Sequence, residues 1–336
     1  MRKLQKTLGE IIYIMKKTFV KILSFCLCLL MLATPLCSCR SKDSSDKLTV
    51  LCTVFPVYDW VKSITQDTEN IEVELLVQNG ADLHSFQPSF SDMASIKNSD
   101  IVIYVGGESD KWVSDSISEN AVAVELSSID GMSKHGISKE SVASESEDHH
   151  EHDHDNTMDE HIWLSVKNAM IACEYICHVL SEKSEINAEK ISQSAKSYIS
   201  TLEGIDKALT DMCVDASSPV VFADRFPFVY LFSDYNIPYY AAFEGCTTDT
   251  NADFSTIIEL AEKLDESEYN CVLTTESPND ALVSKVISQA TKKNAEALAL
   301  NSMQSLTSQD IEDGASYIDI MTANTAVLQK LFKAKD

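Results

Sequence analysis

The feature that most limits the possible folds is a regular alternation of short β-rich runs with longer amphipathic stretches. Eight such runs follow residue 47, four in the first half of the remaining chain and four in the second. They lie at 48–54, 71–77, 101–105, 121–126, 220–223, 239–242, 271–275 and 297–300. Strands that alternate with helical segments form parallel sheets flanked by helices. We therefore expect an α/β protein of two Rossmann-like lobes, each built on a mostly parallel sheet.

The segment between the two sets of runs is predicted to be one long helix. Apolar residues recur every three or four positions from Ile186 to Met212, with only Gly204 as a weak helix breaker. At 1.5 Å per residue this helix would be about 40 Å long, enough to cross both lobes. The alternative is an ordinary packing helix inside one lobe. The predicted domains are a first lobe at 48–185, a linking helix at 186–213 and a second lobe at 214–336.

The N-terminal region is predicted to direct export. Three lysines between positions 16 and 21 precede an almost wholly apolar run from Ile22 to Ala33, which is typical of a secretory signal. Met15 fits the start of such a signal better than Met1. The sequence Leu36-Cys37-Ser38-Cys39 resembles a bacterial lipobox, so we expect 1–38 to be removed and Cys39 to be acylated. Residues 39–47 would tether an extracytoplasmic domain to the cell membrane. The alternative is a plain signal peptide with a chance cysteine.

The charge of the chain favours a cationic partner. It carries 27 basic and 52 acidic residues, for a formal net charge of −25. From residue 39 onward the counts are 21 and 51, a net charge of −30. Nucleic acid and anionic lipid headgroups are therefore poor candidate partners. A single apolar segment also excludes a membrane protein with several spans.

Residues 133–158 form a segment of Ser, Glu, Asp and His with almost no apolar side chains, so we expect a loop outside any core. His149, His150, His152 and His154 alternate there with carboxylates. Imidazoles and carboxylates together suit borderline divalent ions such as Zn²⁺. Ordering such a loop costs conformational entropy, so we expect weak auxiliary capture of metal. The alternative is a solvated acidic loop.

Two further histidines are candidate metal ligands. His84 directly follows the apolar run that ends at Val77, which places it at the carboxyl end of a strand, where open α/β sheets bind their ligands. His161 lies at the start of a helix predicted at 165–180. No histidine follows His178, so a site shared by both lobes must take oxygen or sulfur ligands from the second.

Three blocks around these histidines carry a family resemblance. They are GADLHSFQPSFSD at 80–92, NSDIVIYVGGESDKW at 98–112 and DEHIWLSVKNA at 159–169. In sequence and order they resemble the signature blocks of zinc and manganese receptors of ABC importers, which are metal-binding lipoproteins. The resemblance implies two similar lobes joined by a rigid helix, with one metal ion in the cleft bound by His84 and His161. It also implies a monomer that serves an ABC permease and ATPase.

The second lobe departs from the pattern of that family, in which many members supply a third His or a Glu. Asp224 is the matching candidate ligand, although Arg225 is an alternative for the aligned position, and Asn301 matches a second block. Glu276 is a reserve carboxylate. Each has a structural alternative: a buried Asp224–Arg225 ion pair, a turn capped by Asn301, and a helix capped by Glu276.

The expected function is capture of a divalent ion, most consistent with zinc because of the His-rich loop, for delivery to an importer. Manganese transport, or a role as a surface adhesin or metal store, are the alternatives. An enzyme is disfavoured, because a zinc hydrolase needs an open coordination position and a general base. The HExxH spacing that usually supplies them on a helix occurs only at 150–154, inside the His-rich segment that is predicted to be a loop.

Overall fold

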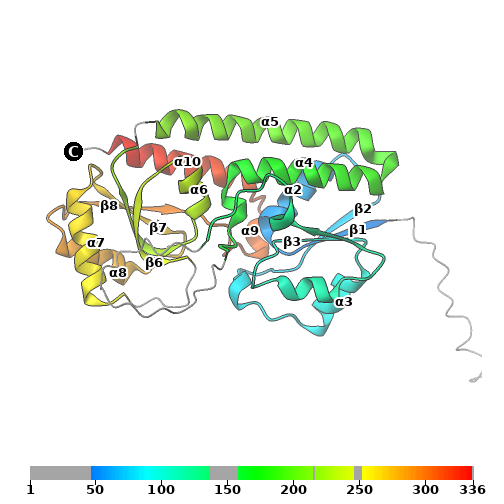
Figure 1. The fold of residues 1–336 in the computed structure, drawn as a ribbon, viewed down its shortest axis with the longest axis horizontal. Helices are drawn as coiled ribbons and strands as arrows, with labels where there is room; N and C mark the ends of the chain where they lie inside the picture. The colour runs from blue at the N-terminus through cyan, green and yellow to red at the C-terminus, as the bar shows by residue number, and fades with distance from the viewer. Residues whose placement is uncertain (1–46, 137–157, 215, 246–251, 335–336) are drawn as a thin grey trace, which may run out of the picture. The chain divides into compact units, whose positions relative to one another are not determined.

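The computed structural model describes residues 47–136, 158–214, 216–245 and 252–334 (Figure 1). Its strands form two four-stranded sheets, in the orders β2-β1-β3-β4 and β6-β5-β7-β8, and every strand pair is parallel. The strands are β1 (Leu48–Cys52), β2 (Ile71–Leu75), β3 (Ile101–Tyr104), β4 (Val122–Glu125), β5 (Val220–Phe226), β6 (Tyr239–Glu244), β7 (Cys271–Thr275) and β8 (Glu296–Leu300). All eight predicted strands are present, and the predicted fold class is confirmed.

Inner and edge strands differ in their sequence patterns for a physical reason. The inner strands β3 and β7 read IVIY and CVLTT and are buried along their whole length. Helices cover both faces of a parallel sheet, so an inner strand needs no polar side. The edge strand β2 instead alternates, and its Glu72 and Glu74 are exposed. We call each sheet with its flanking helices a lobe; both lobes belong to the unit Lys47–Asp336.

Most of the described helices begin at a residue whose side chain caps the first turn. The helices are α2 (Phe55–Thr65), α3 (Phe90–Asn98), α4 (Val166–Lys183), α5 (Ala188–Cys213), α6 (Val229–Asp234), α7 (Phe254–Glu266), α8 (Asp280–Gln289), α9 (Ser308–Glu312) and α10 (Tyr317–Lys333). Ser89 and Asp92 form a capping box at the start of α3, and the Ser165 hydroxyl caps α4. Within the described ranges, no helix combines the length and apolarity needed to cross a bilayer.

The long helix α5 contacts both lobes (Figure 1). It packs against α2 and α4 of the first lobe and against α10, which covers β8 in the second. The Tyr198 hydroxyl donates to Asp59 of α2 at 3.1 Å, and the Tyr235 hydroxyl donates to Asp206 of α5 at 2.8 Å. The predicted helix is therefore confirmed, and packing inside a single lobe is excluded. The division of the chain at residues 185 and 213 stays a prediction.

Candidate metal centre

His84 lies beyond the carboxyl end of β2, in a single 3₁₀ turn at Leu83–Ser85. Asp82 precedes the turn, and its side chain accepts a hydrogen bond from the His84 backbone N–H at 3.0 Å. A side-chain oxygen at this position satisfies a donor that a short turn leaves unpaired. The His84 side chain keeps 23% of its surface exposed. Asp82 thus fixes the backbone of the turn, while the direction of the ring depends on other contacts.

His161 is held more firmly. It directly precedes a 3₁₀ turn at Ile162–Leu164, which leads into α4, and it is only 1% exposed. Asp159 Oδ1 accepts the His161 backbone N–H at 2.9 Å and lies 2.8 Å from the ring atom Nδ1. One carboxylate therefore fixes both the backbone and the ring.

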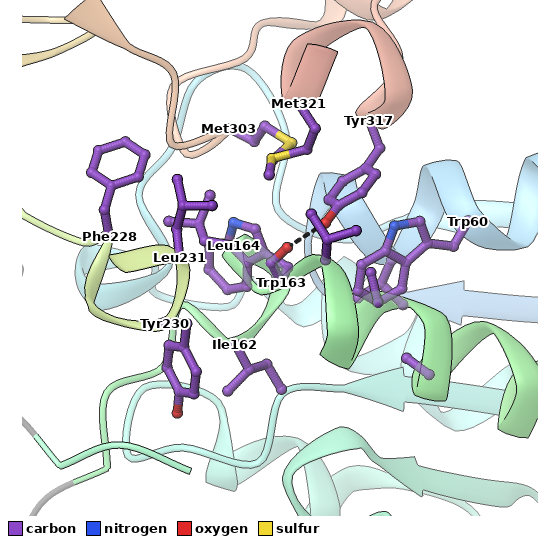
Figure 2. Close-up of a cluster of buried hydrophobic side chains, with 14 of the residues drawn as sticks. Trp60, Ile162, Trp163, Leu164, Phe228, Tyr230, Leu231, Met303, Tyr317 and Met321 are labelled. Atoms are coloured by element: carbon purple, nitrogen blue, oxygen red, sulfur yellow. Dashed lines mark hydrogen bonds between the residues drawn. The ribbon is translucent and has the colours of Figure 1, made fainter. Parts of the chain in front are cut away.

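An aromatic cluster packs the segment that carries His161 (Figure 2). The Tyr317 hydroxyl of α10 donates to the backbone oxygen of Trp163 at 2.7 Å. The Tyr230 hydroxyl of α6 donates to the backbone oxygen of Asp159, also at 2.7 Å. The Trp163 ring meets the His161 ring edge-on, with ring centroids 5.2 Å apart. Side chains of the second lobe therefore hold a histidine of the first.

The structure brings the two predicted histidines together. Their Nε2 atoms are 3.3 Å apart, and their ring centroids are 5.2 Å apart at an interplanar angle of 55°. Two nitrogens bound to one tetrahedral Zn²⁺, each about 2.0–2.1 Å from the metal, are separated by roughly 3.3–3.4 Å. The observed separation therefore equals the edge of such a coordination tetrahedron.

The Nδ1 atoms of both rings face oxygen atoms instead. Nδ1 of His84 lies 2.9 Å from the Ser109 hydroxyl and 3.2 Å from Glu160 Oε2, while Asp159 faces Nδ1 of His161. Burial acts to raise the pKa of Glu160, but its contacts with His84 and Ser109 outweigh burial and hold the pKa below its usual value. An ionised carboxylate favours the tautomer with the proton on Nδ1. The Nε2 lone pairs then point toward each other, and a cation between them removes their repulsion.

In the second lobe, the Asp224 carboxylate is buried near the end of β5 and bonded to its neighbours. Its Oδ2 accepts hydrogen bonds from the Thr275 hydroxyl at 2.6 Å and the Thr275 backbone N–H at 3.2 Å. The Arg225 guanidinium does not form the ion pair considered as an alternative; it lies 3.7 Å from Oδ2 of Asp82. Because Asp82 also caps the His84 turn, the Asp224–Arg225 segment borders that turn.

Glu276 and Asn301 contact a chain segment, at 302–303, that is hydrogen-bonded to Trp163 beside His161. The Glu276 carboxylate accepts hydrogen bonds from the backbone N–H and the hydroxyl of Ser302, each at 2.9 Å. Trp163 Nε1 donates to the backbone oxygen of the same Ser302 at 3.0 Å. The Asn301 side-chain oxygen accepts the Met303 backbone N–H at 2.8 Å, which is the turn-capping contact considered above. Both residues are thus tied to the segment next to His161.

Among the described residues, the structure brings two of the predicted ligands, His84 and His161, into direct proximity. Across the described ranges, no group of three or more His, Cys, Asp and Glu side chains is placed to hold a metal ion. Coordination by Asp224, Asn301 or Glu276 therefore stays a prediction. His149, His150, His152, His154 and the acylation site Cys39 lie outside the described residues.

Two cavities lie away from the histidines. One, of about 680 Å³, follows the edge of β2 between α3 and α9, and the other, of about 740 Å³, lies beside β4 and α4. Neither His84 nor His161 lines them. The paired imidazoles, rather than a large hollow, mark the candidate site.

Sequence reasoning did not identify the contacts that orient His84. The sequence gives Glu160 no recognisable role at His84, although its side chain contacts the His84 ring. Ser109 lies 25 positions from His84, so no local pattern connects the two. A signal that could have pointed to Glu160 and Ser109 is their position along the chain. Ser109 follows a predicted strand and Glu160 precedes a predicted helix, and such loops meet at the carboxyl end of a parallel sheet.

Comparison with curated proteins finds relatives along most of the chain. A zinc-binding lipoprotein AdcA of Streptococcus pneumoniae is 28% identical over 320 residues, which cover 94% of this chain and 61% of the relative. The chain thus spans about three fifths of the length of that lipoprotein. The high-affinity zinc uptake system protein ZnuA of Bacillus subtilis is 27% identical over 295 residues, which cover 86% of this chain and 89% of the relative.

Solved structures share the fold. The metal-dependent lipoprotein YcdH of Bacillus subtilis has a TM-score of 0.69 at 22% identity and covers 85% of this chain and 99% of its own. The Zn(II)-bound ZnuA-like domain of Streptococcus pneumoniae AdcA has a TM-score of 0.66 at 24% identity, with the same coverage.

The family model that matches spans residues 50–331, and so includes both sheets, both histidines and the helix between the lobes. The resemblance that the three sequence blocks carry is thereby confirmed. The matched family is one of uptake components and not of enzymes. The chain belongs to the family of the zinc-uptake complex component A, periplasmic.

Proposed function

We propose that this chain is the extracytoplasmic receptor of a zinc importer. It captures one Zn²⁺ between His84 and His161 and delivers the ion to an ABC-type permease and its ATPase. The observation that carries this proposal is the 3.3 Å separation of the two Nε2 atoms, with both Nδ1 atoms facing oxygen acceptors. The family of the chain and the names of its relatives support the same function.

Zinc is the proposed cargo because of the donor set. Two neutral imidazoles with one or two oxygens suit a four-coordinate Zn²⁺ site, whereas Mn²⁺ favours more oxygen ligands. Manganese is the alternative, since a similar solved structure is a Mn-bound periplasmic metal binding protein of Candidatus Liberibacter asiaticus. Direct competition between the two ions decides between them.

The second lobe would complete the coordination with oxygen. Asp224, Glu276 and Asn301 are the candidates. The Asp224–Arg225 segment borders the His84 turn through Asp82, and Glu276 reaches the His161 segment through Ser302. A ligand from each lobe makes metal affinity depend on how the lobes are arranged. Such a receptor releases its ion when the membrane partner favours the arrangement with weaker binding.

Calorimetric titration of the protein from Ser41 onward tests this proposal. We expect about one tightly bound Zn²⁺ per chain, and His84→Ala and His161→Ala each to abolish the tight event. His178→Ala is the matched control, because His178 lies on α4 with 67% of its side chain exposed and pairs with Glu182. Deletion of 148–155 should remove only weak events. Tight binding that survives in both site variants would contradict the proposal.

A further inference from the structure

We propose that Glu160 is a positioning residue that orients His84 for metal binding. Its buried carboxylate holds Nδ1 of His84, so that Nε2 points toward Nε2 of His161. This inference rests on the proposed function and adds a residue that binds no metal itself. It also makes one short segment responsible for both imidazoles, because Glu160 directly precedes His161.

The two oxygens of Glu160 have different surroundings. Oε1 accepts the backbone N–H of Ser109 at 2.7 Å, which fixes the carboxylate to the loop after β3. Oε2 is buried and accepts no hydrogen bond of regular geometry; it lies at the ion-pair distance of 3.2 Å from Nδ1 of His84, which also lies 2.9 Å from the Ser109 hydroxyl. Only 5% of the Glu160 side chain is exposed. A buried carboxylate oxygen without a partner is costly, so the contact with the His84 ring offsets the burial of Oε2.

The loop after β3 leaves space for this side chain. A Cβ at Gly107 would lie 2.4 Å from Cγ and Oε1 of Glu160, so any residue larger than glycine would displace the carboxylate. The buried carboxylate of Asp110 accepts the backbone N–H groups of Val105, Gly106 and Gly107 at 2.7–3.1 Å. The loop is therefore fixed by its own hydrogen bonds, and Glu160 rests on a rigid support.

His84 needs such a contact more than His161 does. Its turn is a single 3₁₀ turn and its side chain is partly exposed, whereas the His161 ring is buried and packs against Trp163. A ligand whose rotamer is not fixed loses conformational entropy when it binds metal. A carboxylate at Nδ1 also fixes the tautomer that leaves the Nε2 lone pair available.

Glu125 provides a matched control. A Cβ at the neighbouring Gly106 would lie 2.3 Å from Cγ of Glu125, so this second carboxylate packs against the same glycine pair. Its carboxylate accepts hydrogen bonds from the hydroxyls of Tyr104 and Ser127, at 3.3 and 3.1 Å. Replacing Glu125 therefore disturbs the same loop without touching the contact with the imidazole.

The test compares Glu160→Gln with Glu125→Gln in the purified protein from Ser41 onward. We expect Glu160→Gln to lower the affinity for Zn²⁺ about tenfold, in the range known for groups that orient metal ligands, and Glu125→Gln to change it less than twofold. Long-range ¹H–¹⁵N spectra of the metal-free protein should show His84 protonated at Nδ1 in the parent. In Glu160→Gln we expect a mixture of His84 tautomers, while the His161 signals stay unchanged.

Three results would overturn the inference. They are an unchanged affinity in Glu160→Gln, an unchanged His84 tautomer in that variant, and an equal loss of affinity in Glu125→Gln, which would indicate a general effect of the loop. Failure of the proposed function looks different, because the parent protein itself would then bind no Zn²⁺ tightly. Thermal unfolding of each variant confirms that it is folded before the titration.

Discussion

The two histidines differ in how the chain holds them. His161 is buried, is bonded to Asp159 through both backbone and ring, and is packed by Trp163. His84 is partly exposed, and its ring contacts Ser109 and Glu160. The first ring is therefore part of the core, while the second depends on a few polar contacts. Substitutions around His84 should act on metal affinity more than on the stability of the fold.

Asp110 gives a prediction for the pH dependence of stability. Burial raises the pKa of its carboxyl from 3.8 to about 6, although three backbone N–H groups act in the opposite direction. Between pH 4 and 6 the folded protein thus keeps a proton that the unfolded chain has lost. This group therefore stabilises the fold at low pH, and its contribution is lost as the pH rises through 6.

We expect the parent to lose on the order of 2 kcal/mol more unfolding free energy than Asp110→Asn between pH 4 and pH 7. Urea unfolding at a series of pH values gives the unfolding free energy of both proteins. The change of that free energy with pH is compared rather than its absolute value, because Asn accepts fewer of the loop N–H groups. Parallel slopes for parent and variant would show that Asp110 does not titrate in this window.

At the scale of residues, the sequence could predict which imidazoles are candidate metal ligands, but it could not predict which oxygen atoms are. His84 and His161 could be predicted, because histidine at the end of a strand or the start of a helix is a restricted signal. Carboxylates and amides accept hydrogen bonds as readily as they bind metal. Asp224 binds Thr275 and Glu276 binds Ser302 through contacts that only the fold brings together. Residue type therefore could not separate ligation from structural bonding in the second lobe.

At the scale of elements, the strands were predictable because inner strands of parallel sheets are continuous apolar runs. The main difference is β5, which extends to Phe226 instead of ending at Ala223. Asp224 and Arg225 resemble a strand end, but a register shift between Phe222 and Arg225 accommodates the polar pair within the strand. The buried bonds from Thr275 to Asp224 explain why a carboxylate is tolerated there.

The helix α5 allows a stability prediction that is independent of metal. Gly204 lies in its interior and is exposed, and a Cβ there would meet no atom within 4 Å. Gly204→Ala should therefore raise the free energy of unfolding by about 0.5–1 kcal/mol, because alanine loses less backbone entropy in a helix.

Gly314 is the control for this substitution. It also has open space at its Cβ position, but its φ of +95° is a conformation that alanine rarely adopts. Gly314→Ala should consequently destabilise the protein in the same chemical denaturation experiment. If Gly204→Ala proved neutral or destabilising, the assignment of a regular, solvent-facing helical position would be wrong.

At the scale of the whole molecule, both sheets have the same strand order with one long helix between them, as the alternation of runs predicted. The alternation could not predict that aromatic residues of the second lobe pack against the His161 segment. Those contacts join residues more than 70 positions apart. The net charge of −25 adds a field that concentrates cations near the surface, an effect that salt weakens.

Membrane attachment is a separate prediction for the whole chain, because Cys39 lies outside the described residues. If Cys39 is acylated, the parent protein should sediment with the membrane fraction of a bacterial host, and Cys39→Ala should move it to the soluble fraction. Cys37→Ala is the control, since Cys37 does not occupy the lipobox position. Unchanged membrane retention of Cys39→Ala would exclude a lipid anchor at that residue.

The most direct measurement of the central claim is anomalous scattering at the zinc absorption edge from crystals of the zinc-loaded protein. The account predicts one strong peak about 2.0–2.1 Å from Nε2 of both His84 and His161, with at least one oxygen of the second lobe completing the coordination. A strong peak bound elsewhere, with the two imidazoles free of metal, would contradict it.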